Sequence, residues 1–404
     1  PYAATLAGTA HGGIFAVYFL AILYAQFRLL WPVQWSALCL LAAFVPFGNF
    51  VLDRILRKNQ SAFTVKPLPK AWLVYAVIMF TFIDLFTQLP VMSTFASSLG
   101  ASAALAGFIV GLYSLSNTFG NVLSGLFTDK SGAYPVLCIG LAATSAVLFL
   151  YGAVDNAESL MIVRFFHGFL SGLIVPAAFT YLANHTKREK QGSRSAITGA
   201  FVGSAAILGP AYSGIMASRT SVPFVFATVA VLGIVLFFAA LFILRSTGKP
   251  VPKLHIGKPK TKLRLNRGII QAFTGAFFLM FSQGALAYLL PLHIENLGYS
   301  ARFSGTLMSM FGLVAVAMFV LPTNKLFDRV PPLYSFSAGL GILGVSQMLI
   351  GQCGEMPALY AVLALYGIGF ALLFPAMNTL LVHATSPDNR GQAYGYFYAF
   401  FSAG

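Results

Sequence analysis

Four polar side chains lie inside long apolar stretches, where their chemistry needs an explanation. Asp84 and Gln88 are four positions apart, and Arg164 and His167 are three apart, so each pair shares one face of a helix. An unpaired charge at the centre of a membrane-spanning helix costs about 2.5–3.5 kcal/mol. We therefore expect these residues to form one polar cluster, with Asp84 as a proton carrier, Arg164 as its neighbour and His167 as a hydrogen-bonding residue. A static ion pair that organises the helices is the alternative.

The sequence lacks the motifs that are typical of nucleotide-binding sites, metal sites and hydrolases. It contains no Walker loop, no zinc-type spacing of His and Cys, and no nucleophile elbow. Cys39, Cys138 and Cys353 fall in separate apolar stretches, so neither a disulfide framework nor a metal site is indicated. We expect no enzyme activity, no cofactor, no metal and no use of ATP.

The elements that position the cluster are membrane-spanning helices. Hydrophobic residues make up 58% of the 404 positions, charged residues 9%, and the mean hydropathy is +0.80, which predicts an all-α polytopic membrane protein. A helix needs ~20 apolar residues to cross a bilayer. Such segments are found at about 10–29, 35–56, 72–92, 104–126, 134–154, 160–182, 197–216, 224–244, 269–290, 303–320, 334–350 and 358–382, and a last one begins near 395. Because the chain opens on Pro1 without Met and stops inside that last segment, we expect both ends to be cut.

The net charge of +15 comes from basic residues that lie mainly between the apolar segments. Lysine and arginine gather in alternate loops, around residues 54–70, 130, 187–194, 245–267, 325–329 and 390, whereas acidic residues such as Asp155 and Glu355 occupy the others. This is the positive-inside pattern, so the basic loops are predicted to be cytoplasmic and nucleic-acid binding is not expected.

An internal repeat organises most of the chain. An offset of 199 residues carries Asp129 to Asp328, Gly168 to Gly367 and Pro176 to Pro375. Two related bundles of helices usually place a substrate path at their junction. We predict a two-helix module at 1–58, a six-helix bundle at 70–245, a basic cytoplasmic linker at 246–268 and an incomplete second bundle at 269–404.

The first module carries two short motifs. His11-Gly12-Gly13-Ile14-Phe15 and Pro46-Phe47-Gly48-Asn49-Phe50 resemble those of a small uncharacterised bacterial integral-membrane family. The resemblance implies a further helix before Pro1. These helices are also a candidate surface for a membrane-protein partner.

The loop from Gly125 to Gly132 carries the clearest motif. Gly125-Leu126-Phe127-Thr128-Asp129-Lys130-Ser131-Gly132 resembles the G-x-L-x-D-[RK]-x-G signature of the major facilitator superfamily, and the likeness extends from about Trp72 to the end. It implies two pseudo-symmetric six-helix bundles, preceded here by two extra helices. It also implies that Asp129, its repeat image Asp328 and the following Arg329 hold a cytoplasmic gate, by charge pairing or by facing a helix N-terminus. The alternative is that Asp129 only caps the next helix.

Two further motifs bear on the direction and the driving force of transport. Arg164-x-x-His167-Gly168 resembles the superfamily's fourth-helix motif, with His in place of Gln, and in proton-coupled members that arginine is implicated in moving the proton. The repeat maps Asp84 onto Gln283 and Arg164 onto Leu363, so proton coupling is expected in the first bundle alone. The fifth bundle helix resembles the G-x-x-x-G-P-x-x-G motif of exporting antiporters, through Gly199, Gly203, Gly209, Pro210 and Gly214. The alternative is that these small residues only allow ordinary close packing of helices.

The resulting hypothesis is a secondary transporter of the bacterial plasma membrane. We expect it to exchange protons for small amphipathic molecules by alternating access, with cavity candidates at Asn117, Gln283, Tyr288 and Asn378. An importer or facilitator of a metabolite, and a non-transporting scaffold or assembly factor, are the alternatives.

Overall fold

A computed structural model describes residue 39 and residues 71–244, 263–299, 302–321 and 326–404. The chain divides into two compact units, Pro1–Trp72 and Leu73–Gly404. The predicted two-helix module and most of the predicted linker lie outside the described residues. The account below therefore concerns the second unit.

Helices make up the described part of the first bundle, which corresponds to the first copy of the repeat. They are α4 (Ala71–Thr87), α5 (Met92–Ser98), α6 (Ala103–Ser131), α7 (Ala133–Leu150), α8 (Ala157–Ser171), α9 (Ile174–Asn184), α10 (Gln191–Arg219) and α11 (Val222–Ile243). Two single turns of 3₁₀ helix, η2 (Tyr151–Ala153) and η3 (Arg188–Lys190), follow α7 and α9.

The second copy of the repeat is also helical throughout its described residues. It contains α12 (Arg267–Asn296), α13 (Arg302–Val320), α14 (Leu326–Arg329), α15 (Pro332–Ile350), α16 (Met356–His383) and α17 (Arg390–Ala403). Side chains cap several helix starts in both copies; for example, the Asn266 side chain accepts from the Ile269 amide at 3.0 Å at the start of α12.

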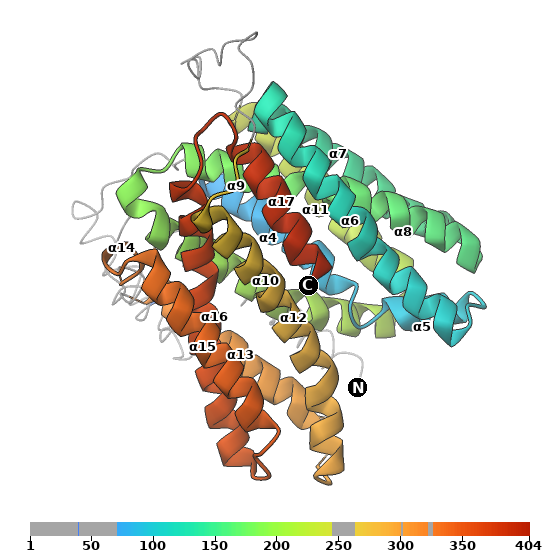
Figure 1. Ribbon diagram of the computed structural model, residues 1–404. Helices are drawn as coiled ribbons and strands as arrows, with labels where there is room; N and C mark the ends of the chain where they lie inside the picture. The colour runs from blue at the N-terminus through green and yellow to red at the C-terminus, as the bar shows by residue number, and fades with distance from the viewer. Residues whose placement is uncertain (1–38, 40–70, 245–262, 300–301, 322–325) are drawn as a thin grey trace. The chain divides into compact units, whose positions relative to one another are not determined.

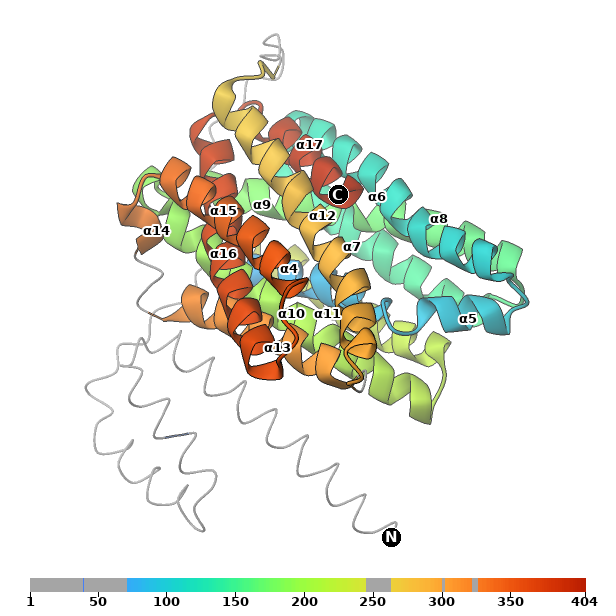
Figure 2. The same ribbon diagram turned by 60° about the horizontal axis from the view of Figure 1, so that its bottom comes forward.

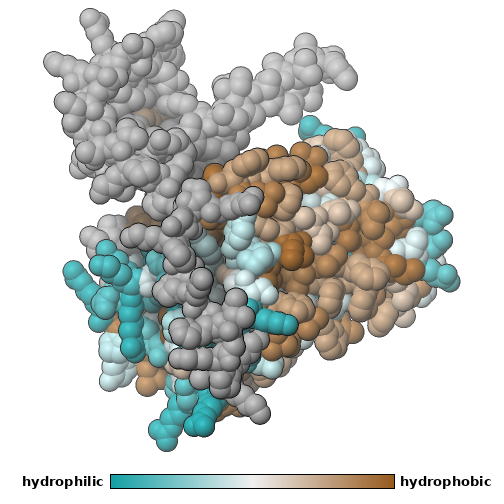
Figure 3. All heavy atoms as spheres, turned by 90° about the horizontal axis from the view of Figure 1, so that it is seen from above, coloured by the Kyte–Doolittle hydropathy of each residue, from teal (hydrophilic) through white to brown (hydrophobic). Residues whose placement is uncertain are grey.

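The described residues form eight helices that are long and apolar enough to cross a membrane, or nine if a bent pair is counted as one span. This confirms the prediction of an all-α multi-pass membrane protein. Large hydrophobic side chains remain exposed on these helices, and Figure 3 shows apolar residues over much of the visible face, with hydrophilic residues at its margins. Such a surface is expected where lipid, rather than water, surrounds the helices.

Two predicted spans are interrupted, and a proline explains each interruption. The segment predicted at 72–92 is the pair α4 and α5, bent by 48° across a turn that contains Pro90. Proline disfavours helical geometry in the residue before it, so α4 ends at Thr87. The segment predicted at 160–182 is α8 followed by α9, because Pro176 has no amide hydrogen to donate back toward Gly172.

The two bundles are held together by helices that reach across. α17 packs along α6 and also contacts α9, while α10 packs against α13, α16 and α14. Figures 1 and 2 show α17 beside α6 of the first bundle, with α12, α13, α15 and α16 grouped on the other side. One helix of each copy therefore packs on the other copy, as expected for two related bundles.

The repeat extends to individual hydrogen bonds. Gln191 donates to the carbonyl oxygens of residues 183 and 186, both at 3.0 Å. Its image Arg390 donates to the carbonyl oxygens of residues 382 and 385, at 3.5 and 3.4 Å. The acceptors are separated by the same offset as the donors, so the two helix connections have the same geometry.

Candidate functional site

The predicted polar cluster forms in the interior of the first bundle. Asp84 and Gln88 come from α4 and the turn after it, and Arg164 and His167 come from α8. Their exposed fractions are 1%, 3%, 2% and 0%, respectively. The charges are therefore enclosed by protein and do not face lipid.

The Asp84 carboxylate lies in a chain of hydrogen-bonding groups. Its Oδ2 is 3.0 Å from His167 Nε2, and His167 Nδ1 is 2.9 Å from the Tyr151 hydroxyl. The Ser171 hydroxyl is 3.5 Å from the same Oδ2 and accepts from the Tyr113 hydroxyl at 3.0 Å. The other carboxylate oxygen, Oδ1, is buried and has no hydrogen-bond partner among the described residues.

Arg164 is held mainly by neutral groups. Its guanidinium donates to the Gln88 side-chain oxygen and to the carbonyl oxygens of Ile109 and Val110, at 3.2 and 3.0 Å for the two carbonyls. It also lies 4.9 Å from the centroid of the Tyr113 ring, within reach of a cation–π interaction.

The sequence identified Arg164 as the neighbour of Asp84, but the structure places His167 at the carboxylate and connects Arg164 to Asp84 through Gln88. Gln88 donates to the backbone oxygen of Asp84 at 3.0 Å. Tyr113, Ser171 and Tyr151 were not predicted as members of the cluster. Ser171 is one turn beyond His167 on α8, so its helical spacing was a usable signal; the tyrosines come from other helices and gave none.

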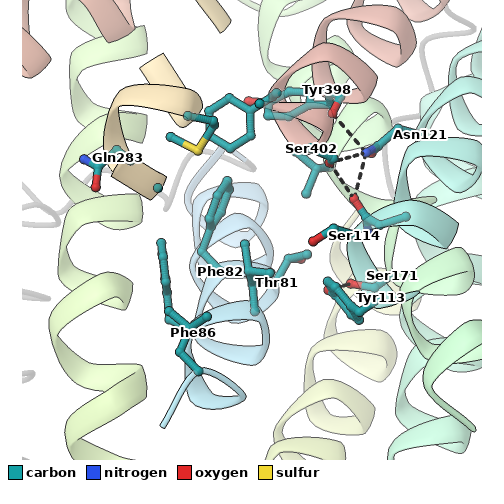
Figure 4. Close-up of a pocket in the computed structure, with 18 of the residues that line it drawn as sticks. Thr81, Phe82, Phe86, Tyr113, Ser114, Asn121, Ser171, Gln283, Tyr398 and Ser402 are labelled. Atoms are coloured by element: carbon teal, nitrogen blue, oxygen red, sulfur yellow. Dashed lines mark hydrogen bonds between the residues drawn. The ribbon is translucent and has the colours of Figure 1, made fainter. Parts of the chain in front are cut away.

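A cavity of about 360 Å³ lies between the two bundles, next to this cluster. Its wall comes from the second half of α4, the middle of α6, the junction of α8 and α9, the middle of α12 and the end of α17. Figure 4 shows Phe82 and Phe86 of α4 on one side, with Ser114 of α6 opposite them. Tyr113 and Ser171 belong both to the cavity wall and to the Asp84 cluster.

A hydrogen-bonded network closes one side of the cavity and joins the bundles. The Asn121 amide donates to Asn117 Oδ1 at 2.8 Å, to the Tyr398 carbonyl at 3.2 Å and to the Ser402 hydroxyl at 3.2 Å. Ser402 in turn donates to Asn117 Oδ1 at 2.9 Å, as the dashed lines in Figure 4 show. The network links α6 of the first bundle to α17 of the second.

The predicted cavity residues divide into two groups. Asn117 and Gln283 line the cavity. Tyr288 and Asn378 do not: Tyr288 is 71% exposed on another face of α12, and Asn378 is fully buried and donates to the Phe374 carbonyl of its own helix at 2.9 Å. Tyr288 therefore faces outward, and Asn378 is enclosed within the second bundle, where its side-chain oxygen has no hydrogen-bond partner among the described residues.

The two aspartates that were predicted to hold a gate each bind the N-terminus of a helix from the opposite bundle. Asp129 accepts from the amides of Gly391 and Gln392, at 2.7 and 2.8 Å, at the start of α17. Asp328 accepts from the Ser193 amide at 2.8 Å, at the start of α10. Because a helix N-terminus attracts negative charge, both contacts hold the bundles together at the end that carries the basic loops. We call this pair of contacts the latch.

Glycines allow the backbones of the latch to approach closely. A Cβ at Gly125 would lie 2.5 Å from the Gly391 carbonyl oxygen and 2.9 Å from the Gly395 Cα. Gly132 has φ +90°, a conformation that suits glycine and turns the chain from α6 into α7. The remaining predicted gate residues, Lys130 and Arg329, are exposed beside the latch.

The glycine motif of α10 lies partly at the junction of the bundles. A Cβ at Gly199 would meet the Phe319 ring at 2.7 Å, and one at Gly203 would meet Val316 at 2.8 Å, both on α13. Gly209 abuts α4 at Phe86 and Thr87, whereas a Cβ at Gly214 would meet nothing within 4 Å. Pro210 lies inside α10, which continues through it.

Comparison with known proteins agrees with this architecture. The chain is 26% identical over 326 residues to the multidrug resistance protein MdtG of Escherichia coli O9:H4 (strain HS), covering 77% of this chain and 79% of MdtG. The MdtG of Escherichia coli (strain K12 / DH10B) is 27% identical over the same shares. These bacterial relatives are named for multidrug resistance.

Solved structures share the fold at low sequence identity. The human organic anion transporter MFSD10 (TETRAN) superposes with a TM-score of 0.68 at 15% identity, covering 84% of this chain and 91% of that one. The proton:xylose symporter XylE gives a TM-score of 0.63 at 14% identity, covering 82% and 84%.

Family models match both parts of the chain. Residues 2–58 match a Domain of unknown function (DUF3817), which confirms that the leading segment resembles a family without an assigned role. Residues 74–404 match the Major Facilitator Superfamily. This second match spans most of the chain and contains the latch, the cavity and the buried cluster, and so the protein is a multi-pass membrane transporter that belongs to the Major Facilitator Superfamily.

Proposed function

We propose that the protein exports small amphipathic molecules across a bacterial plasma membrane in exchange for protons. The observation that carries this proposal is the position of Asp84. Its carboxylate is buried, one of its oxygens lacks a hydrogen-bond partner among the described residues, and its other oxygen is 3.5 Å from the hydroxyl of Ser171, which belongs to the cavity wall. A carboxylate in this position can take up and release a proton as the cavity changes its access.

The latch supports alternating access as the transport mechanism. It joins the bundles at the basic end, which the positive-inside pattern assigns to the cytoplasm. The cavity is lined by parts of α4, α6 and α12 that lie farther from this end than the latch does. The conformation therefore corresponds to a transporter closed toward the cytoplasm. Release of both aspartates from the helix N-termini would let the bundles separate at that end.

Each member of the cluster has a defined part in this scheme. Asp84 receives the proton, and His167 holds the carboxylate in place while bonded to Tyr151. Arg164 is fixed by Gln88 and two carbonyl groups, so its positive charge stays near Asp84 throughout. Ser171 and Tyr113 provide hydroxyl groups between the carboxylate and the cavity.

The direction of transport is proposed from two features. The α10 glycines resemble the motif of exporting antiporters, and Gly199 and Gly203 bring α10 close to α13 across the junction of the bundles. The bacterial relatives at 26–27% identity are named multidrug resistance proteins. Both features favour export over import.

The test is transport by the full chain in liposomes with the cytoplasmic face outward. With an acidic lumen, radiolabelled triphenylphosphine oxide should accumulate inside, and a protonophore should abolish the accumulation. Asp84→Asn should abolish it as well, because an amide cannot carry a proton. Ser171→Ala should slow it about tenfold, as expected for one lost hydrogen bond to a charged group.

The control variant is Asp388→Asn, which removes an exposed loop carboxylate outside the cluster and should transport normally. Accumulation that ignores the proton gradient would contradict the coupling. Full activity of Asp84→Asn would contradict the assigned carrier, and proton-driven loss of the compound from the lumen would identify an importer.

A further inference from the structure

We infer that the cavity between the bundles selects uncharged, mainly apolar molecules with aromatic rings and excludes lipophilic cations. This inference rests on the proposed export function, whose cargo it specifies. It follows from the chemistry of the cavity wall and from the position of the cluster behind that wall.

The described wall of the cavity carries no charged side chain. Its apolar lining residues include Phe82, Phe86, Phe401 and Met280, and its polar groups are hydroxyl and amide groups. An ion that enters such a cavity loses its hydration without gaining a counter-ion. The phenyl faces attract a cation, but this attraction offsets only part of the lost hydration.

Most polar groups on the wall are already engaged with the protein. Thr81 donates to the Val77 carbonyl at 2.9 Å, and Asn117 donates to the Gly168 carbonyl at 3.0 Å. The carbonyl oxygen of Asn117 accepts from Asn121 and from Ser402. A ligand with many hydrogen-bonding groups would leave them unsatisfied in the cavity, so the geometry favours a mainly apolar molecule with few polar atoms.

The charges behind the wall do not attract a cation either. Asp84 and Arg164 belong to one cluster, in which Gln88 contacts both residues. With Asp84 ionised, the formal charges of the two side chains sum to zero. With Asp84 protonated, Arg164 leaves the cluster positive. In neither state does the cluster present net negative charge to the cavity, so a cation finds no counter-ion during the transport cycle.

A consequence concerns the driving force. If an uncharged molecule leaves the cell while one proton enters, each exchange moves one net positive charge inward. The membrane potential would then drive export together with the proton gradient. A transporter that exchanged one proton for one monovalent cation would respond to the proton gradient alone.

The experiment compares three probes of similar shape on the purified full chain, without any gradient. They are triphenylphosphine oxide (uncharged), methyltriphenylphosphonium (cationic) and methyltriphenylborate (anionic), and binding is measured by equilibrium dialysis. The uncharged probe should bind at least about tenfold more tightly than either ion, as expected when an ion is desolvated without a partner. Equal or tighter binding of either ion, or no saturable binding of the uncharged probe, would overturn the inference.

Variants at Ser114 test whether the cavity itself makes the choice. Ser114 lies on the wall with an exposed side chain, and Figure 4 shows its hydroxyl directed into the space between α4 and α6. Ser114→Asp should raise the affinity for methyltriphenylphosphonium at least about tenfold by supplying a counter-ion. Ser114→Asn, whose side chain has the shape of Asp but no charge, should not raise it. Ser114→Trp should abolish binding of the uncharged probe by filling the cavity. Unchanged binding in both Ser114→Trp and Ser114→Asp would place the selectivity elsewhere and overturn the inference.

These measurements separate the inference from the proposed function. Binding requires neither reconstitution nor a proton gradient. If the probes bind with the expected selectivity but no proton-driven flux occurs, coupled export is contradicted and the inferred selectivity stands. If the cationic probe is exported in exchange for protons, coupled export stands and the inferred selectivity is contradicted.

Discussion

The two bundles share their latch but differ in their buried charges. Asp129 and Asp328 are repeat images, and each binds the N-terminus of a helix from the other bundle. Asp84 and Arg164 have no charged counterparts: their images are Gln283, on the cavity wall, and Leu363, which is fully buried. A gate that closes by contact between two halves needs a partner on each side, whereas one protonatable site is sufficient to couple transport to an ion.

The difference also shows how one framework accommodates two kinds of interior. Gly168 packs its helix backbone against the Tyr113 carbonyl, and its image Gly367 packs against the Phe311 carbonyl. The same close approach therefore places Arg164 one turn before Gly168 in the first bundle and Leu363 at the matching place in the second. The repeat fixes the helix packing, and the side chains placed within it decide the function.

Replacing the buried charge with its repeat image should have the largest effect. Arg164→Leu would make the first bundle resemble the second, but it would leave Asp84 and Gln88 buried without the guanidinium. The buried Gln88 side-chain oxygen would lose its donor, and Asp84 would lose the nearby positive charge. A buried neutral group left without its hydrogen-bond partner costs about 1–3 kcal/mol, and a charged group costs more. We expect a clear loss of thermal stability in detergent, together with loss of proton-coupled flux.

The matched control in the second bundle is Leu363→Met. It conserves volume in an apolar setting and should cost less than about 1.5 kcal/mol. If Arg164→Leu melted like Leu363→Met, the buried cluster would not distinguish the two bundles energetically, and the comparison would fail on this point.

Glycine substitutions in the latch should have a smaller effect, similar in the two halves. A Cβ at Gly391 would collide with the Asp129 carboxylate and the Gly125 carbonyl, and one at its image Gly192 would collide with the Phe327 carbonyl. Overpacking of this kind costs about 1–3 kcal/mol. Because the clash occurs only when the latch is closed, Gly391→Ala and Gly192→Ala should both increase the population of molecules open at the basic end.

Spin labels at Ser131 and Tyr334 would report this opening in a background without native cysteines, since both positions are exposed near the basic ends of their bundles. Gly214→Ala is the control, because a Cβ there meets nothing within 4 Å. An unchanged distance distribution in Gly391→Ala would show that the latch tolerates the added methyl group.

The sequence predicted the architecture more completely than the contacts between helices. Apolar segments of sufficient length define the spans, and the repeat, together with the Asp129 motif, indicates which loops face each other. It also indicated that Asp84, Gln88, Arg164 and His167 would meet, because their helical spacing and depth agree. These features depend on local pattern and could therefore be derived without coordinates.

Contacts set by helix rotation could not be derived in this way. His167, rather than Arg164, contacts the Asp84 carboxylate, and Tyr151 completes the chain from another helix. Tyr288 and Asn378 were predicted at the cavity because they are polar residues in apolar segments, but the rotation of α12 and α16 places them elsewhere. The rotation of a helix depends on all of its neighbours, so a single polar residue does not reveal it.

Neutralising the two latch aspartates should produce the smallest change and a measurable asymmetry. Asp129 accepts from two backbone amides of α17, and Asp328 accepts from the Ser193 amide of α10. A carboxylate at a helix N-terminus contributes about 0.3–1 kcal/mol, which corresponds to about a two- to fivefold change in population. In the spin-label experiment, Asp129→Asn should open the latch more than Asp328→Asn, and the double variant should open it most. A larger effect of Asp328→Asn would contradict this order. It would mean that the single-amide contact with α10 stabilises the closed state more than the two-amide contact with α17.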